Sequence, residues 1–434
     1  MSGARPAGPS ALAATRAILL GDGIDPEFFT RTAQRFPRVA YVRLGREQLY
    51  FLSHPEPVRQ ALIDSARVST KNRGLQGARR ILGDGLLTSE NPYHQHARRL
   101  IQPAFHADRM PDYTAVMRTA AAQLSARWRA GARVDMAADM SALTFRIVGG
   151  ALFGTALDSA GPVRAALSEL LAAYNRAFLP WFEVSLRLGT PLGRRVRAAS
   201  AQLDQVVRDL IARQRHAPAP NLISTLLDDF TEEQLRDEAM TLLLAGHETT
   251  GAALTFAWYL LDRHPQIRSW LEEELDAAEP DLAAADVAAL PRTRAVIAET
   301  MRLYPPAWTV GRRFTEPVVL DGWAVPAGAS ALIPQWVLHR DGRFWERPRE
   351  FVPQRWLRSG TFGLTVPGQP RYAYLPFGAG ARKCIGEAFA WTEAVLVLAI
   401  LARDWRAAAA PDHRLRAAIT LRPADPLPMT LHRR

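Results

Sequence analysis

The chain has 434 residues, of which 48% are hydrophobic and 22% are charged, and it contains a single cysteine. This length and composition predict a globular protein with a sizeable core, in one large domain or two small ones. One cysteine excludes an intramolecular disulfide bond and is typical of a reducing, cytoplasmic compartment. The net charge of +11 comes from scattered basic residues, which fits solubility or an acidic protein partner rather than nucleic acid.

The N-terminal region has no predicted signal peptide or membrane anchor. Residues 1–10, with two prolines and two glycines, are expected to form a disordered extension. The apolar residues 11–20 include Arg16 and are too few to span a bilayer. No basic region, apolar region and cleavage site follow one another. We therefore predict one folded domain over residues 11–434, without a transmembrane anchor.

Hydrophobic patterning predicts a mainly α-helical protein with small β-sheets. Residues 39–52 alternate in polarity around Gly45-Arg46 and predict a hairpin, and residues 55–65 predict a short helix. Residues 71–85 are rich in glycine and basic side chains, which is typical of a loop. Residues 172–185 are unusually aromatic, as in a packed core or a wall that contacts substrate.

A long helix is predicted to cross the domain. Thr231-Glu232-Glu233-Gln234 has the form of a capping box, and the helical pattern continues to about Asp262. At 1.5 Å per residue, about 30 residues give a helix about 45 Å long. Its middle reads Ala245-Gly246-His247-Glu248-Thr249-Thr250, and glycine, carboxylate and threonine are poor choices for a helix interior. This departure indicates either a functional site or a tolerated polar kink.

The only cysteine lies in Phe377-Gly378-Ala379-Gly380-Ala381-Arg382-Lys383-Cys384-Ile385-Gly386, before an apolar helical run. Its thiol is either a small buried hydrophobe or a thiolate that binds metal. Gly380 and Gly386 allow tight turns that bring N–H groups toward the sulfur, and the following helix directs its dipole there. Arg382 adds positive charge, and Phe377 can shield the loop from water. These neighbours favour an ionised metal ligand.

The pattern Phe-x-x-Gly-x-Arg-x-Cys-x-Gly in this segment resembles the haem-binding loop of the cytochrome P450 family. The resemblance implies a single-domain fold with haem b between the long helix and the cysteine loop. It also implies that Cys384 is the axial thiolate and that Arg382 pairs with a haem propionate. A thiolate ligand pushes electron density onto iron and favours cleavage of the oxygen–oxygen bond.

Two further segments resemble the propionate-binding parts of that family. His94 and Arg98 are four residues apart in a helical pattern and therefore share one helix face. By themselves they could be a solvated surface pair, but the family places a similar pair against the haem propionates. In the segment Ala307-Trp308-Thr309-Val310-Gly311-Arg312-Arg313, one arginine resembles a further propionate ligand, and the spacing to Pro317 favours Arg312 over Arg313.

The middle of the long helix resembles the oxygen-activation motif of the same family. The resemblance implies that Gly246 lets the helix open locally, that Thr249 donates a hydrogen bond to bound oxygen, and that Glu248 relays protons. Glu299 and Arg302 form only an i,i+3 pair by themselves. Followed by Pro353-Gln354-Arg355-Trp356, they resemble the family's structural triad of Glu299, Arg302 and Arg355.

The motifs occur in family order between about residues 89 and 386. The resemblance implies a monooxygenase that inserts one atom of O2 into a small apolar substrate, such as a terpenoid, polyketide or fatty acid of specialised metabolism. Electrons would come from NAD(P)H through a reductase and a ferredoxin or flavodoxin. The same haem chemistry also supports desaturation, phenol coupling or nitration. A haem sensor or carrier without turnover is the alternative of another class, and the Glu248–Thr249 pair argues against it.

Overall fold

The computed structural model describes residues 5–19, 24–154, 166, 169–170, 188–217, 221–279 and 284–434. In this part of the chain helices predominate and the strands form small sheets, so the fold is the mainly α architecture with small β-sheets that the sequence predicts. The aromatic residues 172–185 lie outside the described residues.

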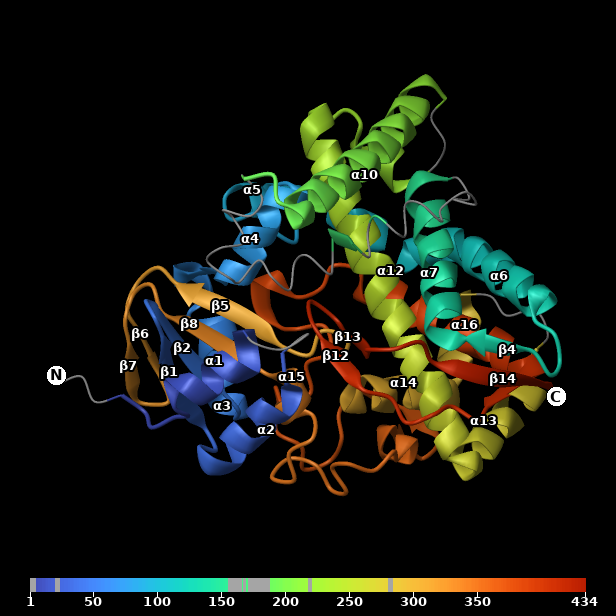
Figure 1. Ribbon diagram of the computed structural model, residues 1–434. Coiled ribbons are helices and arrows are strands. Elements are labelled where there is room, and N and C mark those ends of the chain that lie inside the picture. Colours follow the sequence, from blue (N-terminus) through green and yellow to red (C-terminus); the bar gives the residue numbers. More distant parts are fainter. Residues whose placement is uncertain are drawn as a thin grey trace.

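The long helices lie on one side of the molecule and the largest sheet lies on the other (Figure 1). The helices are α1 (Ala11–Leu19), α2 (Pro26–Arg35), α3 (Pro55–Arg59), α4 (Arg73–Leu82), α5 (Tyr93–Ile101), α6 (Met110–Arg127), α7 (Met136–Phe153), α10 (Pro191–His216), α11 (Leu222–Leu226), α12 (Glu232–Arg263), α13 (Pro265–Ala277), α14 (Pro291–Leu303), α15 (Gln335–Leu338) and α16 (Glu387–Asp404). Helix α12 runs obliquely between the two sides (Figure 1).

The largest sheet has the strand order β1-β2-β8-β5-β3, and a smaller sheet has the order β11-β14-β4. The strands of these two sheets are β1 (Val39–Leu44), β2 (Glu47–Leu52), β3 (Ser69–Lys71), β4 (Arg133–Asp135), β5 (Val310–Phe314), β8 (Ser330–Ile333), β11 (Trp405–Ala408) and β14 (Pro428–Arg433). Three antiparallel pairs join β6 (Val318–Leu320) to β7 (Trp323–Val325), β9 (Leu357–Arg358) to β10 (Thr361–Phe362), and β12 (Leu415–Ala417) to β13 (Leu421–Pro423).

Helix α12 is the central helix that the sequence predicts. Its N-terminus is a complete capping box: the Thr231 hydroxyl accepts from the Gln234 N–H, and the Gln234 side chain accepts from the Thr231 N–H. Most of its length is buried, and its middle packs on α7, where Thr144 donates to the His247 carbonyl oxygen at 2.7 Å. This packing fixes the middle of α12, in which His247 and Thr250 are buried while Gly246, Glu248 and Thr249 are partly exposed.

Among the described helices, α7 is long and apolar enough to cross a membrane. However, 61% of its residues are buried inside the protein. Its burial and its packing on α12 identify it as a core helix.

The structure confirms the predicted hairpin and short helix but not the predicted loop. Strands β1 and β2 pair around Gly45, and α3 continues into a π-helical turn over Gln60–Asp64. The prediction of a loop over residues 71–85 is wrong, because most of that segment is helix α4. The Asn72 side chain caps it by accepting from the Leu75 N–H, and Gly83 ends it with a φ of 78°. Gly83 therefore marks the end of the helix, whereas Gly74 and Gly77 lie within it.

Residues 5–10, which the sequence places in a disordered extension, run beside the edge strand β1. The Ala7 carbonyl oxygen accepts from the Tyr41 N–H at 3.2 Å, and Arg5 donates to the Tyr41 hydroxyl at 3.0 Å. An edge strand offers unpaired backbone groups, and this segment satisfies one of them.

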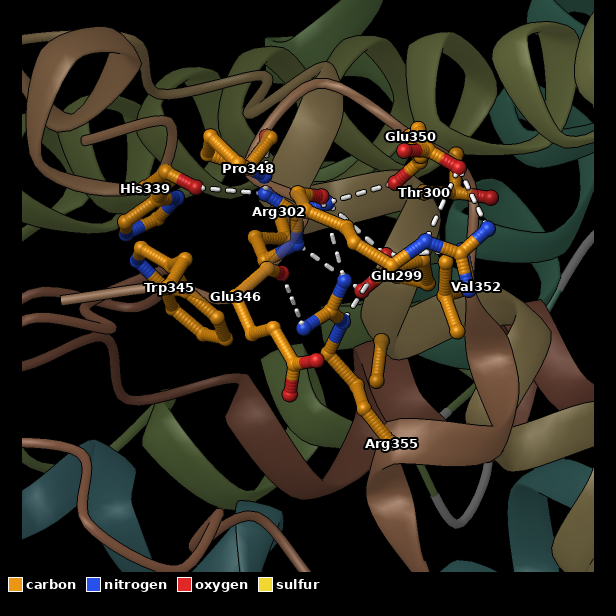
Figure 2. Close-up of polar contacts among 12 residues, drawn as sticks. Glu299, Thr300, Arg302, His339, Trp345, Glu346, Pro348, Glu350, Val352 and Arg355 are labelled. Carbon is orange, nitrogen blue, oxygen red and sulfur yellow. Dashed lines mark hydrogen bonds and ion pairs between the residues drawn. The ribbon is translucent and has the colours of Figure 1, made fainter. Parts of the chain in front are cut away.

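The predicted triad forms at the end of α14 (Figure 2). Glu299 and Arg302 are fully buried and pair at 2.8 Å, and Arg355 Nε lies 3.2 Å from the same carboxylate oxygen of Glu299. The Trp356 indole and the Val352 N–H also donate to this carboxylate. Arg302 donates in turn to the carbonyl oxygens of His339, Pro348 and Glu350. The triad thus joins α14 to the segment after α15.

His339 lies beside this triad and is fully buried. Its Nε2 accepts from the Leu375 N–H at 2.8 Å, so the neutral ring carries its proton on Nδ1. Burial, followed by repulsion from Arg302, lowers the pKa of His339 to about 3 from its usual 6.5. Above pH 6.5 the ring is neutral in both folded and unfolded chains, whereas below it only the unfolded chain takes up a proton.

We therefore expect the folded state to lose stability as the pH falls from 6.5 toward 3, by up to about 1.4 kcal/mol per pH unit from this group. Urea unfolding midpoints of the wild type and His339→Gln between pH 7.5 and 5 test this. The variant should show the shallower decline, and parallel curves would contradict the prediction.

Candidate active site

The cysteine loop connects a short 3-10 turn, Gly380–Arg382, to the N-terminus of α16. Gly378 and Gly380 have φ values of 70° and 74°, which glycine adopts with little strain. A Cβ at Gly380 would lie 2.5 Å from the Leu62 carbonyl oxygen, so this position also needs glycine for space. The Cys384 N–H donates to the Phe377 carbonyl oxygen at 2.9 Å and closes the loop.

Cys384 is exposed at the end of this loop. Desolvation by the surrounding chain raises the pKa of its thiol, while a hydrogen bond from the Gly386 N–H lowers it. Gly386 has a φ of −87°, so it supplies this N–H without the special conformation that the sequence suggests. A coordinated metal ion deprotonates a thiol outright, and the loop is therefore suited to a thiolate held by iron.

The four basic residues predicted to hold propionates line one small cavity. It has a volume of about 50 Å³, and its walls include His94, Arg98, Arg312 and Arg382. Three separate elements supply these side chains, namely α5, β5 and the cysteine loop. Arg98 donates to the Lys383 carbonyl oxygen at 2.8 Å and so joins α5 to the residue next to Cys384.

Positive charge in this cluster exceeds the negative charge that faces it. Burial and repulsion from Arg382 lower the pKa of His94 to about 3 and that of Arg312 to about 10. Arg382 pairs with Glu90 at 2.6 Å, and no other carboxylate among the described residues forms an ion pair with these four side chains. The donor set therefore fits a group with two carboxylates, such as haem.

Two residues that the sequence analysis missed complete the cluster. Lys71 is buried and donates from Nζ to the carbonyl oxygens of Leu86 and Ser89, both at 2.6 Å. Burial, followed by repulsion from Arg382, lowers its pKa to about 7. Glu90 accepts from the Lys71 N–H at 2.7 Å while it pairs with Arg382. Lys71 lies in the segment wrongly predicted as a loop, and no motif pointed to Glu90.

The predicted oxygen-activation segment is a continuous part of α12, so the local helix opening expected at Gly246 is not present. A Cβ at Gly246 would lie 2.8 Å from Val148 Cγ2, and the glycine thus lets α7 pack closely. The Thr249 hydroxyl donates to the Ala245 carbonyl oxygen at 2.8 Å. This bond satisfies the hydroxyl within the helix, and such a bond to the i−4 carbonyl oxygen often bends a helix slightly.

Glu248 is held by a segment far away in sequence. Its carboxylate accepts from the Thr420 hydroxyl at 2.9 Å and lies 3.4 Å from the Arg422 guanidinium. The Glu248 side chain is 11% exposed and that of Arg422 is 27% exposed. The β12–β13 hairpin therefore fixes the predicted proton relay, which the local sequence of α12 does not indicate.

These features, a cysteine loop, a cluster of basic side chains beside it and a polar turn in the central helix, define a haem-thiolate protein. The chain belongs to the cytochrome P450 family, whose family model, Cytochrome P450, matches residues 6–417. It is therefore a P450 monooxygenase, which uses haem iron and O2.

Similar proteins agree with this assignment. The chain is 38% identical to cyclooctatin synthase of Streptomyces melanosporofaciens, over 86% of this chain and 84% of that protein. It is 32% identical to pentalenene oxygenase of Streptomyces avermitilis, over 86% and 85%. Its fold is similar to the crystal structure of CYP175A1 from Thermus thermophillus, with a TM-score of 0.79, 28% identity and coverage of 98% and 99%.

Proposed function

We propose that the protein hydroxylates or epoxidises a small terpenoid in specialised metabolism, in a catalytic domain over residues 11–434. The observation that carries the haem assignment is the convergence of four predicted basic side chains on one cavity beside the cysteine loop. The substrate class rests on relatives named cyclooctat-9-en-7-ol 5-monooxygenase and pentalenene oxygenase.

In this proposal the thiolate of Cys384 would hold the iron of haem b, and the loop residues Phe377, Gly380 and Gly386 would shape its surroundings. Arg98, Arg312 and Arg382 would hold the propionates by charge-assisted hydrogen bonds, and His94 would donate to them as a neutral ring. Lys71 adds a further basic group beside them. When bound, haem supplies the site at which O2 is activated.

In this proposal the polar turn of α12 relays protons from solvent to the site. Glu248 is positioned to take a proton from solvent, because its side chain is partly exposed next to Arg422. Thr249 follows it in the same turn, and its hydroxyl, which donates to the Ala245 carbonyl oxygen, would be the next proton-carrying group. Gly246 keeps α7 close and so holds this turn in place.

We propose that the protein acts in the cytoplasm, where a reductase and a ferredoxin or flavodoxin pass it electrons from NAD(P)H. Incubating the holoenzyme with a surrogate reductase, each carrier in turn and a panel of terpene hydrocarbons and fatty acids tests the whole proposal. A product heavier by one oxygen atom, labelled by ¹⁸O2, supports it. Oxygen incorporation into none of the terpenes, but into fatty acids, would contradict the substrate class.

Loss of the Arg422 contact should uncouple turnover. Because general acid–base catalysis contributes roughly 100- to 10,000-fold, we expect Glu248→Gln to lower product formation at least about tenfold and Arg422→Gln by a smaller factor. Both should release more hydrogen peroxide per nicotinamide oxidised, since protons reach the site less efficiently. Product and peroxide yields measured over pH 6 to 9 test this.

Two variants serve as controls for this prediction. Arg422→Lys keeps the charge near Glu248 and should restore most of the coupling. Arg414 lies near the same hairpin, but its side chain is 80% exposed and pairs with Asp425, so Arg414→Gln should behave as wild type. Equal uncoupling by Arg414→Gln and Arg422→Gln would show that only the stability of the hairpin matters.

A further inference from the structure

A cleft of about 710 Å³ lies between α2, the C-terminal end of α12 and the segment that follows α15. Figure 1 shows α2, α14 and α15 in the lower part of the molecule, away from α10. Leu260, one of the lining residues, follows Thr249 by eleven residues on α12, or about 16 Å along the helix axis. The cleft is thus separate from the candidate active site.

Four aromatic side chains line the cleft, and its size suits a small organic molecule. Tyr259, Tyr304, Trp336 and Phe351 all line it. Cavities of roughly 300 to 1,000 Å³ with mostly apolar walls and a few polar groups are typical of small-molecule sites. The wall therefore offers an apolar surface to a ligand of this size.

Two arginines of the cleft have no acidic partner among the described residues. The Arg340 guanidinium lies 3.1 Å from the centre of a Trp336 ring and 5.1 Å from that of Tyr304. No described carboxylate lies within 4.0 Å of the guanidinium of Arg340 or Arg349. Desolvation lowers the pKa of Arg340 to about 9, which leaves it charged at neutral pH.

Most other charged side chains of the cleft have a partner of opposite charge. Arg263 pairs with Asp412 at 2.6 Å, and Arg343 pairs with Asp341 at 2.5 Å. Glu27 also lines the cleft and raises the pKa of Arg340 through space, at a distance beyond an ion pair. Two free guanidinium groups therefore face one free carboxylate, and positive charge remains.

We propose that this cleft binds a small amphipathic oxyanion, whose carboxylate or phosphate group contacts Arg340 and Arg349 while its apolar body lies on the aromatic wall. Stacking on Trp336 occupies the face of the Arg340 guanidinium and leaves its in-plane N–H groups to donate. Arg349 is exposed and can approach the anion from the rim.

Titration of the holoenzyme with dodecanoate, dodecyl phosphate and dodecyltrimethylammonium tests the proposal. Binding is measured by calorimetry, the Trp336 indole by NMR of ¹⁵N-labelled tryptophan assigned with Trp336→Phe, and occupancy of the haem pocket by the Soret band. We expect an anionic probe to bind and shift the Trp336 signal without a Soret change, and the cationic probe to bind at least about tenfold more weakly, a difference of about 1.4 kcal/mol. Comparing the two anions shows which head group the site prefers.

Arg349→Gln changes an exposed side chain and should leave folding intact, while weakening anion binding about threefold to tenfold, or about 0.7 to 1.4 kcal/mol. Arg340→Gln should weaken it further. Arg347, which is exposed and paired with Glu350, provides the matched control, and Arg347→Gln should bind as wild type. Equal affinity for the anionic and cationic probes, an unmoved Trp336 signal, or unchanged binding by Arg349→Gln would each overturn the proposal.

Discussion

Replacing Cys384 by serine should abolish the red-shifted Soret band that we expect from the reduced wild-type protein with carbon monoxide. The band depends on a thiolate ligand, and Cys384 is the only cysteine in the chain, so no other thiol can take its place. A serine hydroxyl keeps the size of the side chain but lacks the electron donation of sulfur. The measurement is the carbon monoxide difference spectrum of the dithionite-reduced protein, together with its haem content.

Lys383→Gln is the matched control for this prediction. Lys383 is the preceding residue, its side chain is half exposed, and it pairs with Glu387. Its replacement should leave the red-shifted band in place, because the backbone bonds of the loop are unchanged. A red-shifted band that persists in Cys384→Ser would contradict ligation by this thiol, and a band typical of imidazole ligation in wild type would identify a different ligand.

Sequence reasoning predicted well wherever one continuous segment determines the structure. The capping box of α12, the β1–β2 hairpin and the backbone of the cysteine loop depend on neighbours within a few residues, and the structure contains each of them. The prediction of a loop over the α4 segment was wrong, because glycine and arginine are common in loops. The cap at Asn72 and the packing of the helix decide the conformation here.

The site was predicted less completely, because part of it depends on contacts between distant segments. Lys71 and Glu90 become part of the basic cluster only when β3 pairs with β5 and brings Lys71 opposite Arg312. Thr420 and Arg422 reach Glu248 from more than 170 residues away. No local pattern marks such residues. The helix opening expected at Gly246 is absent for a related reason. A Cβ at this position would meet Val148 of α7, so the glycine allows close packing of the two helices, which the sequence of α12 alone does not indicate.

Glu299→Gln should destabilise the protein by about 3 to 5 kcal/mol, because it leaves the buried Arg302 without its counter-charge. The carboxylate accepts from five donors: two on Arg302, and one each on Val352, Arg355 and Trp356. An amide of the same shape would turn its own N–H2 toward some of these donors. Arg302 would stay buried, since its guanidinium also donates hydrogen bonds to three carbonyl oxygens.

Chemical denaturation followed by circular dichroism measures this loss, and the haem-to-protein ratio measures its consequence. We expect the variant to accumulate with little haem, because the triad anchors the segment that leads toward the cysteine loop (Figure 2). Glu350→Gln makes the same chemical change nearby. Its side chain pairs with Arg347 on the surface, and its backbone carbonyl still accepts from Arg302, so stability and haem content should match wild type.

Comparing the two variants distinguishes the effect of losing a buried charge from that of losing a surface charge. If Glu299→Gln lost no more than about 1 kcal/mol of stability, the three carbonyl oxygens that accept from Arg302 would be enough to hold its buried charge, which contradicts the prediction. A large loss in Glu299→Gln that is absent in Glu350→Gln would instead show that the counter-charge itself holds Arg302. Folding would then depend on the triad, and haem binding would depend on it through the segment between α15 and the cysteine loop.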